Sequence, residues 1–219
     1  ALSAGLLNLW RSPWILLLPF IWLSGWQLQQ HDWSAPAGEP FTASLIQGAI
    51  PQELKWQPQQ FKPTLEIYLK LTEEQPDSQL IIWPETAVPA FSEQVETSFL
   101  QPLSERLAKQ NQDLLLGIPV RQQDGSYYNA MLSLGVSGRG QYYKQHLVPF
   151  GEFMPLRFLL EPLIETFSIP MSEFGRGAPN QPPISIAGHT TGISICYEDS
   201  FGTEVAATLP QAAFLVNAS

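Results

Sequence analysis

Three residues whose side chains support nucleophilic catalysis each stand at the end of a strand-like run of this sequence. Glu85 follows LIIWP, Lys144 follows QYY, and Cys196 ends TTGISIC. A thiol attacks well only as the thiolate and therefore needs a base beside it. A carboxylate can take that proton, and an ammonium group can stabilise the oxyanion of a tetrahedral intermediate. Together the three residues predict covalent catalysis with Cys196 as nucleophile, Glu85 as general base and Lys144 as oxyanion stabiliser.

Each of these residues taken alone has a structural explanation. A cysteine in a strand is commonly a small core residue, a glutamate after a strand is commonly a surface cap, and a lysine is commonly solvated. A Cys–His pair is less favoured, because the histidines are expected in a linker, a loop and a hairpin turn: His31, His146 and His189. With a single cysteine the chain forms no internal disulfide framework. The combination of the three residues, rather than any one, indicates chemistry.

The elements that must position these residues follow from hydrophobic periodicity. Apolar runs predict strands over residues 41–50, 79–83, 113–120 and 212–217, and helical patterns cover 61–71 and 95–110. Turn residues predict hairpins within 121–144, at Asp124-Gly125 and Ser137-Gly138, and within 182–199, at Ala187-Gly188. A further helix is expected before the last strand. This order predicts an α/β domain with a mixed sheet.

Composition limits the class of protein. The chain has 219 residues, enough for one sizeable core with an appendage. Its 11 Lys and Arg stand against 20 Asp and Glu, without a basic run, which argues against a nucleic-acid partner. Because the sequence starts at Ala1 and stops in the strand-like AAFLVNAS, we expect it to be a fragment cut at both ends.

The N-terminal part predicts a membrane segment. Residues 12–30, between Arg11 and His31, carry no charge and contain three tryptophans. Pro19 would kink a helix there, and a buried core helix or a signal-peptide remnant are the alternatives. We expect residues 1–30 to be the end of a transmembrane bundle, 31–40 a linker and 41–219 the catalytic domain. Because the basic Arg11 precedes this segment, the positive-inside rule predicts that the residues after His31 lie outside the cytoplasm.

Several sequence strings resemble one enzyme superfamily. The order Glu, Lys, Cys within IIWPET, KQHLVPFGEF and ICYED resembles the nitrilase (carbon–nitrogen hydrolase) superfamily. IQGAIPQELKW, LIIWPETAVP, YYKQHLVPFGEFMPLR, SEFGRG and ICYED are similar to its membrane branch, the apolipoprotein N-acyltransferases. From Phe41 onward, the resemblance implies a nitrilase-like αββα sandwich, truncated here and carried on a bundle of transmembrane helices. It also implies the bacterial inner membrane, with the catalytic domain on the periplasmic side.

The resemblance further implies a reaction. Cys196 attacks the sn-1 ester of a phospholipid, forms a thioester and releases a lysophospholipid. The α-amino group of the diacylglyceryl-cysteine of an apolipoprotein then takes the acyl chain. Glu85 would be the base, and Lys144, helped by the backbone N–H of Tyr197, would stabilise the oxyanion. The phospholipid, the apolipoprotein and the membrane are the implied partners, with no cofactor and no metal.

Supporting roles are also implied by the resemblance. Glu152 would hold Lys144 charged and oriented, with a solvent-facing loop acid as the alternative. Glu198 would hold the catalytic residues in place without itself contacting the substrate. Trp56 would lie near the substrate entrance, with a core role as the alternative. The lysine loop itself, too rich in Pro and Gly for a regular packed element, predicts a lid that admits lipid, formed by its apolar residues: Val148, Phe150, Phe153, Met154 and Leu156.

Two other functions remain open. A soluble-type nitrilase or amidase with the same three residues would hydrolyse a small carbon–nitrogen substrate, but it predicts no membrane span and a polar lysine loop. A membrane-tethered binding domain without catalysis predicts loss of at least one of Glu85, Lys144 and Cys196, and all three are present.

Overall fold

The computed structural model describes residues 13–33, 35, 38–149, 151–153, 174–209 and 211–219. The chain divides into two compact units, Ala1–Glu39 and Pro40–Ser219.

The first unit contains the turn η1 (Pro13–Leu16) and the helix α2 (Leu17–Gln29). None of the residues of α2 is buried, and Trp22 is 79% exposed. A membrane-spanning helix needs about 20 consecutive apolar residues. No helix in the described part of the chain is long and apolar enough to cross a membrane. The transmembrane helix expected over residues 1–30 is therefore not shown by the structure.

The second unit begins with a five-stranded sheet, called here the first sheet. Its strands are β1 (Ala43–Leu45), β2 (Leu80–Ile82), β3 (Asp113–Arg121), β4 (Tyr127–Gly135) and β5 (Gly140–Tyr143), in that spatial order. β1, β2 and β3 are parallel to one another, β4 pairs antiparallel with β3, and β5 pairs antiparallel with β4. The carboxyl ends of β2 and β5 lead to the predicted base and the predicted lysine.

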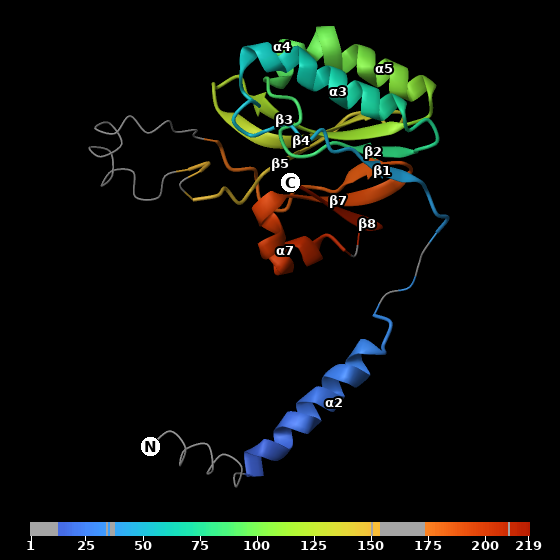
Figure 1. The fold of residues 1–219 in the computed structure, drawn as a ribbon, viewed down its shortest axis with the longest axis vertical. Helices are drawn as coiled ribbons and strands as arrows, with labels where there is room; N and C mark the ends of the chain where they lie inside the picture. Colours follow the sequence, from blue (N-terminus) through green and yellow to red (C-terminus); the bar gives the residue numbers. More distant parts are fainter. Residues whose placement is uncertain (1–12, 34, 36–37, 150, 154–173, 210) are drawn as a thin grey trace, which may run out of the picture. The chain divides into compact units, whose positions relative to one another are not determined.

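A three-stranded second sheet packs against the first (Figure 1). It contains β6 (Ile184–Ile186), β7 (His189–Ile195) and β8 (Phe214–Ala218), with β6 antiparallel and β8 parallel to β7. The two sheets share one apolar cluster, formed by Leu80, Ile82, Leu115, Met131, Tyr142, Ile184, Ile186, Ile193, Ile195, Val216 and Ala218.

Helices cover the other face of each sheet (Figure 1). On the first sheet these are η2 (Pro58–Gln60), α3 (Phe61–Glu73), α4 (Ser92–Val95), the π-helical turn η3 (Glu96–Leu100) and α5 (Gln101–Lys109). The apolar faces of α3 and α5 form one core cluster with β2, β3 and β4. Beside the second sheet lie η4 (Cys196–Ser200) and α7 (Gly202–Ala207). The layers are therefore helix, sheet, sheet and helix, the αββα order that the sequence resemblance implies.

Two boundaries differ from the expected ones. The first strand is shorter than 41–50, because Gly48 packs against the ring of Tyr68 and Ala49 takes a left-handed φ of 50°, which carries the chain out of the sheet. The helix expected over 95–110 is split into α4, η3 and α5, with a proline in the first turn of α5. The single mixed sheet indicated by periodicity is in fact two mixed sheets.

Candidate active site

The loop that follows β2 places Glu85. Trp83 is fully buried, and its indole N–H donates to Oγ1 of Thr72 on α3 at 3.0 Å. Gly117 on β3 lies so close to this loop that a Cβ there would come within 2.4 Å of the Pro84 carbonyl oxygen. The loop is therefore fixed both to the helical layer and to the neighbouring strand, and Glu85 follows at once.

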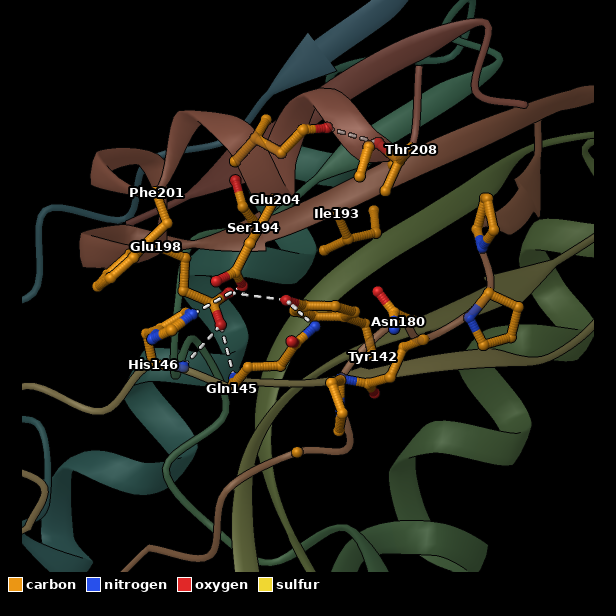
Figure 2. A pocket seen from close by; sticks show the side chains of 18 of the residues that line it. Tyr142, Gln145, His146, Asn180, Ile193, Ser194, Glu198, Phe201, Glu204 and Thr208 are labelled. Atoms are coloured by element: carbon orange, nitrogen blue, oxygen red, sulfur yellow. Dashed lines mark hydrogen bonds and ion pairs between the residues drawn. The ribbon is translucent and has the colours of Figure 1, made fainter. Parts of the chain in front are cut away.

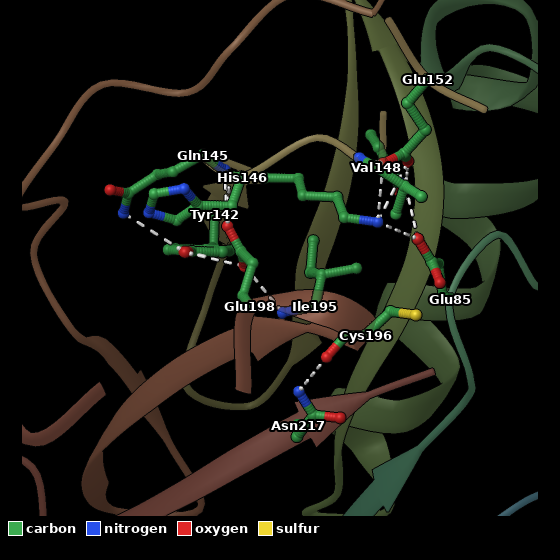
Figure 3. A network of polar contacts seen from close by, with 12 residues as sticks. Glu85, Tyr142, Gln145, His146, Val148, Glu152, Ile195, Cys196, Glu198 and Asn217 are labelled. Atoms are coloured by element: carbon green, nitrogen blue, oxygen red, sulfur yellow. Dashed lines mark hydrogen bonds and ion pairs between the residues drawn. The ribbon is translucent and has the colours of Figure 1, made fainter. Parts of the chain in front are cut away.

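Lys144, directly after β5, is held in a polar network instead of in solvent (Figure 3). Only 1% of it is exposed. Its Nζ contacts Oε1 of Glu85 at 2.9 Å and the carboxylate of Glu152 at 3.0 Å. Its main-chain N–H donates to the carbonyl of Asn129, and its own carbonyl accepts from the N–H of Gly177, both at 2.8 Å. Backbone and side chain are thus both fixed.

The carboxylates of Glu85 and Glu152 also keep Lys144 positively charged. Burial lowers the pKa of Lys144, but the hydrogen bonds and charges of Glu85 and then of Glu152 outweigh burial, so that the pKa is raised overall. Lys144 is therefore an ammonium group at neutral pH, which the stabilisation of an oxyanion requires.

Asn129 on β4 is a member of this network that the sequence reasoning missed. It is 4% exposed, and its Nδ2 donates to Oε1 of Glu85 at 2.6 Å and to Oε1 of Glu152 at 3.0 Å. Asn129 orients both carboxylates without adding charge. The sequence feature that could have indicated Asn129 is its amide within the strand YYNAMLSLG. The structure buries the central part of that strand throughout.

Glu152 is held by its own loop. Its Oε2 accepts the N–H of Val148 at 2.9 Å, and its main-chain N–H donates to the Val148 carbonyl at 2.9 Å. The N–H of Phe174 donates to the Glu152 carbonyl at 3.3 Å. With its ion pair to Lys144, this makes Glu152 a part of the site and not a solvent-facing loop acid.

Cys196 stands where β7 turns into η4. Its φ of 51° lies in the left-handed region, which is uncommon for a residue other than glycine. Asn217 on β8 donates through Nδ2 to the Cys196 carbonyl at 3.2 Å. In Figure 3 the sulfur atom points toward Glu85. The sharp turn thus presents the thiol to the polar network.

The surroundings keep the thiol protonated at rest. Burial raises the pKa of Cys196, and the charge of Glu85 raises it further. The Lys144 ammonium and a hydrogen bond from the Tyr197 N–H act in the opposite direction but are outweighed, and a hydrogen bond to Glu85 also favours the thiol. A protonated thiol beside a carboxylate suits proton transfer to Glu85 at the moment of attack.

Glu198 connects the two sheets behind the site (Figure 3). It is 3% exposed, and it accepts the phenol O–H of Tyr142 at 3.0 Å and the N–H of Ile195 at 2.7 Å. The N–H groups of Gln145 and His146 also donate to it, at 2.6 and 3.1 Å. One carboxylate therefore fixes the segment after Lys144 and the strand before Cys196.

A cavity of about 970 Å³ opens at Glu85 and Glu152. Trp56 lines it and is 54% exposed, so this indole is not part of the core. Phe153 is half-buried and lies beneath the guanidinium of Arg176, 4.8 Å from ring centroid to Cζ. The other residues expected in the lid or its flank, Phe150, Met154 and Leu156, lie outside the described residues. The exposed ring of Tyr197 packs edge-on against Phe201.

A second cavity of about 790 Å³ lies against Glu198 (Figure 2). His146 lines it, stacked on Phe201 at 3.6 Å between ring centroids, with Nε2 at 2.7 Å from Glu204. None of Glu85, Lys144 and Cys196 lines this cavity. Among the described residues, no cluster of three or more His, Cys, Asp or Glu could hold a metal ion.

Two packed sheets, each covered by helices, thus carry an acid, a lysine and a cysteine at their strand ends, the arrangement of a cysteine-dependent acyl-transferring or hydrolysing enzyme. The carbon-nitrogen hydrolase family matches residues 42–219, and the chain belongs to that family. Two solved structures show the same fold. One is a carbon–nitrogen hydrolase from Helicobacter pylori G27, with a TM-score of 0.55 and 18% sequence identity over 81% of this chain and 59% of that chain. The other is an amidase of the nitrilase superfamily from Nesterenkonia AN1, with a TM-score of 0.55 and 18% sequence identity over 84% of this chain and 66% of that chain.

The similarity to curated relatives indicates a narrower class of enzyme than the family does. The chain is 46% identical to the apolipoprotein N-acyltransferase of Nitrosomonas europaea, over 91% of this chain and 40% of the relative. It is 44% identical to the protein of the same name from Methylococcus capsulatus, over 99% of this chain and 43% of the relative. The chain thus spans about two fifths of the length of these relatives.

Proposed function

We propose that the protein carrying this chain is an N-acyltransferase of lipoprotein maturation. It transfers a fatty acyl chain from a phospholipid, through a thioester on Cys196, to the α-amino group of the diacylglyceryl-cysteine of apolipoproteins. The observation that carries the proposal is the ion pair of the buried Lys144 with Glu85 beside Cys196, in a chain 46% identical to a protein named apolipoprotein N-acyltransferase. No similar support exists for hydrolysis of a small carbon–nitrogen compound.

In the first half-reaction Glu85 accepts the thiol proton as the sulfur of Cys196 forms a bond to the ester carbonyl carbon. The negative charge that develops on the carbonyl oxygen is stabilised by the ammonium of Lys144 and the N–H of Tyr197. Collapse of the tetrahedral intermediate breaks the carbon–oxygen bond of the ester. The departing alkoxide takes the proton from Glu85, and a lysophospholipid leaves.

In the second half-reaction the α-amino group attacks the thioester carbon and gives a proton to Glu85. Collapse of this intermediate breaks the carbon–sulfur bond, and the thiolate of Cys196 takes the proton back. Asn129 and Glu152 keep Glu85 and Lys144 in position through both halves. A thioester that waits for an amine is at risk from hydroxide, so exclusion of water favours transfer over hydrolysis.

A lipid donor requires contact with a bilayer. We assign residues 1–30 to the membrane part, 31–40 to a linker and 41–219 to the catalytic domain, on the periplasmic side of the bacterial inner membrane. The uncharged α2 with its exposed apolar side chains supports this assignment. The exposed Trp56 at the cavity supports entry of an acyl chain there, and Phe150, Phe153 and Met154 complete the proposed lid.

Intact-mass measurement of the full-length protein tests the proposal. After incubation with a phospholipid of one chain length, we expect a mass increase of one acyl group that is located on Cys196 and is removed by a diacylglyceryl peptide with a free amino terminus. Cys196→Ala should form no adduct, and Cys196→Ser should form only traces. Absence of the adduct, together with release of ammonia from small amides, would show a hydrolase instead.

A further inference from the structure

Lys55 is a second lysine at the site, and the mechanism above does not use it. It lies in a turn fixed by main-chain hydrogen bonds from Leu54 to Pro51 at 3.0 Å and from Gln57 to Leu54 at 3.0 Å. Its Nζ donates to the main-chain carbonyl of Glu85 at 3.1 Å. Lys55 is therefore attached to the same residue whose carboxylate contacts Lys144, at the opposite end of that residue.

Lys55 lines the 970 Å³ cavity and is the sole lysine or arginine among the described residues that do so. Its side chain is half-buried, yet none of the ion pairs among the described residues includes it. Burial lowers the pKa of Lys55, and the charge of Glu85 opposes this only in part. The Glu85 carboxylate is already bound by Lys144 and Asn129, so the Lys55 ammonium group in the cavity has no ion-pair partner of its own in the described part of the chain.

We propose that Lys55 binds the phosphodiester of the acyl donor, a subsite that rests on the function proposed above. A phosphodiester carries one negative charge, and a lysine ammonium binds phosphate as a point charge. In a phospholipid the phosphate and the sn-1 ester are joined through the three carbons of glycerol. An anion at Lys55 would lie next to Glu85, toward which the sulfur of Cys196 points, so the ester of the same molecule can reach the thiol (Figure 3).

The subsite distinguishes the donor from the acceptor. A diacylglyceryl-cysteine contains no phosphate, and its attacking amine has to be neutral. Lys55 therefore contributes to the first half-reaction and not to the second. A neutral ester of the same acyl chains, such as a diacylglycerol, should react without help from Lys55.

The test compares two donors in the full-length protein, in a non-ionic detergent, by intact mass. With Lys55→Met, we expect acyl-enzyme formation from a phospholipid to slow by about tenfold to hundredfold, the range for loss of a charged hydrogen bond. Formation from the matched diacylglycerol should change by less than about twofold, the scatter expected for a removed surface charge. Lys55→Arg should retain most of the phospholipid rate. Lys62→Met, an exposed lysine on α3, is the matched control and should leave both donors unaffected.

A binding measurement separates this proposal from the proposed function. In a Cys196→Ala background, calorimetry compares a short-chain phosphatidylglycerol, the matched diacylglycerol and inorganic phosphate, with and without Lys55→Met. Weaker binding of the phospholipid alone supports a lipid subsite, and weaker binding of inorganic phosphate as well shows that the phosphate suffices. If Lys55-dependent binding persists although the wild type forms no acyl-enzyme, the proposed function fails and the anion subsite stands. Equal slowing of both donors, or unchanged phospholipid binding, would overturn the proposal and leave Lys55 as a support for the Glu85 loop.

Discussion

The carboxylates of Glu85 and Glu152 are held by the same two donors. Nζ of Lys144 contacts them at 2.9 and 3.0 Å, and Nδ2 of Asn129 contacts them at 2.6 and 3.0 Å. Two partly buried carboxylates that share the same donors repel each other unless positive charge and hydrogen bonds offset the repulsion. The arrangement permits a division of roles: Glu85 can take a proton from the thiol while Glu152 continues to contact Lys144 and to raise the pKa of that lysine.

Asn129→Ala should slow acyl-enzyme formation without unfolding the protein. Glu85 then loses a donor at 2.6 Å, and we expect a rate lower by about tenfold to hundredfold, from loss of a charged hydrogen bond. Asn129→Asp should be worse, because it adds a third carboxylate. Rates and melting curves are measured beside Gln110→Ala, an exposed polar residue at the end of α5. Equal activity of Asn129→Ala and the wild type would show that Lys144 alone positions Glu85.

The titration of Cys196 should shift in opposite directions in two variants. Glu85 raises the thiol pKa and Lys144 lowers it. Glu85→Gln should therefore move the midpoint of iodoacetamide alkylation to lower pH, and Lys144→Met should move it to higher pH. The measurement is the alkylation rate against pH, with the exposed Glu204→Gln as a control. Midpoints that move in the same direction in both variants would contradict the electrostatic account.

Glu198→Gln should destabilise the fold as well as the site. The amide oxygen of the variant can replace one carboxylate oxygen, but the NH₂ group then faces one pair of donors. That pair is either the N–H groups of Gln145 and His146 or the O–H of Tyr142 and the N–H of Ile195. Leaving buried donors unpaired costs about 1–3 kcal/mol each. We expect a lower midpoint of chemical unfolding and a lower acylation rate. A variant with unchanged stability but reduced rate would instead give Glu198 a direct role with the substrate.

Gly177→Ala should displace the lysine. A Cβ at Gly177 would come within 2.2 Å of the Tyr143 carbonyl oxygen, so the chain must move away from the residue before Lys144. We expect a loss of stability of about 1–3 kcal/mol, the usual cost of overpacking, and a lower rate. Gly202→Ala is the control, because nothing lies within 4 Å of the added carbon. Similar melting temperatures for the two variants would show that the 174–177 segment adapts freely.

Much of the site could be predicted from the sequence, because the ends of apolar strands are local features. Glu85, Lys144 and Cys196 each follow a segment whose pattern identifies it as a strand, and the structure brings all three together. The contacts of Asn129 depend on the pairing of β4 with β3 and β5, which periodicity does not determine. The contact between Lys55 and the Glu85 carbonyl depends on how one turn packs on another. No feature of the sequence indicated the left-handed φ of Cys196, since cysteine does not favour that region.

The link that Glu198 makes between the two sheets has a consequence for the order of assembly. Every strand of the first sheet precedes every strand of the second in the chain, and folding during synthesis proceeds from the N-terminal side. Glu85, Asn129 and Lys144 are therefore all synthesised before Cys196, which joins them only when β7 docks and Glu198 locks the lysine segment. A nascent chain that has not yet docked β7 thus carries a thiol with no base beside it, and Cys196 becomes a nucleophile only once β7 packs against the first sheet.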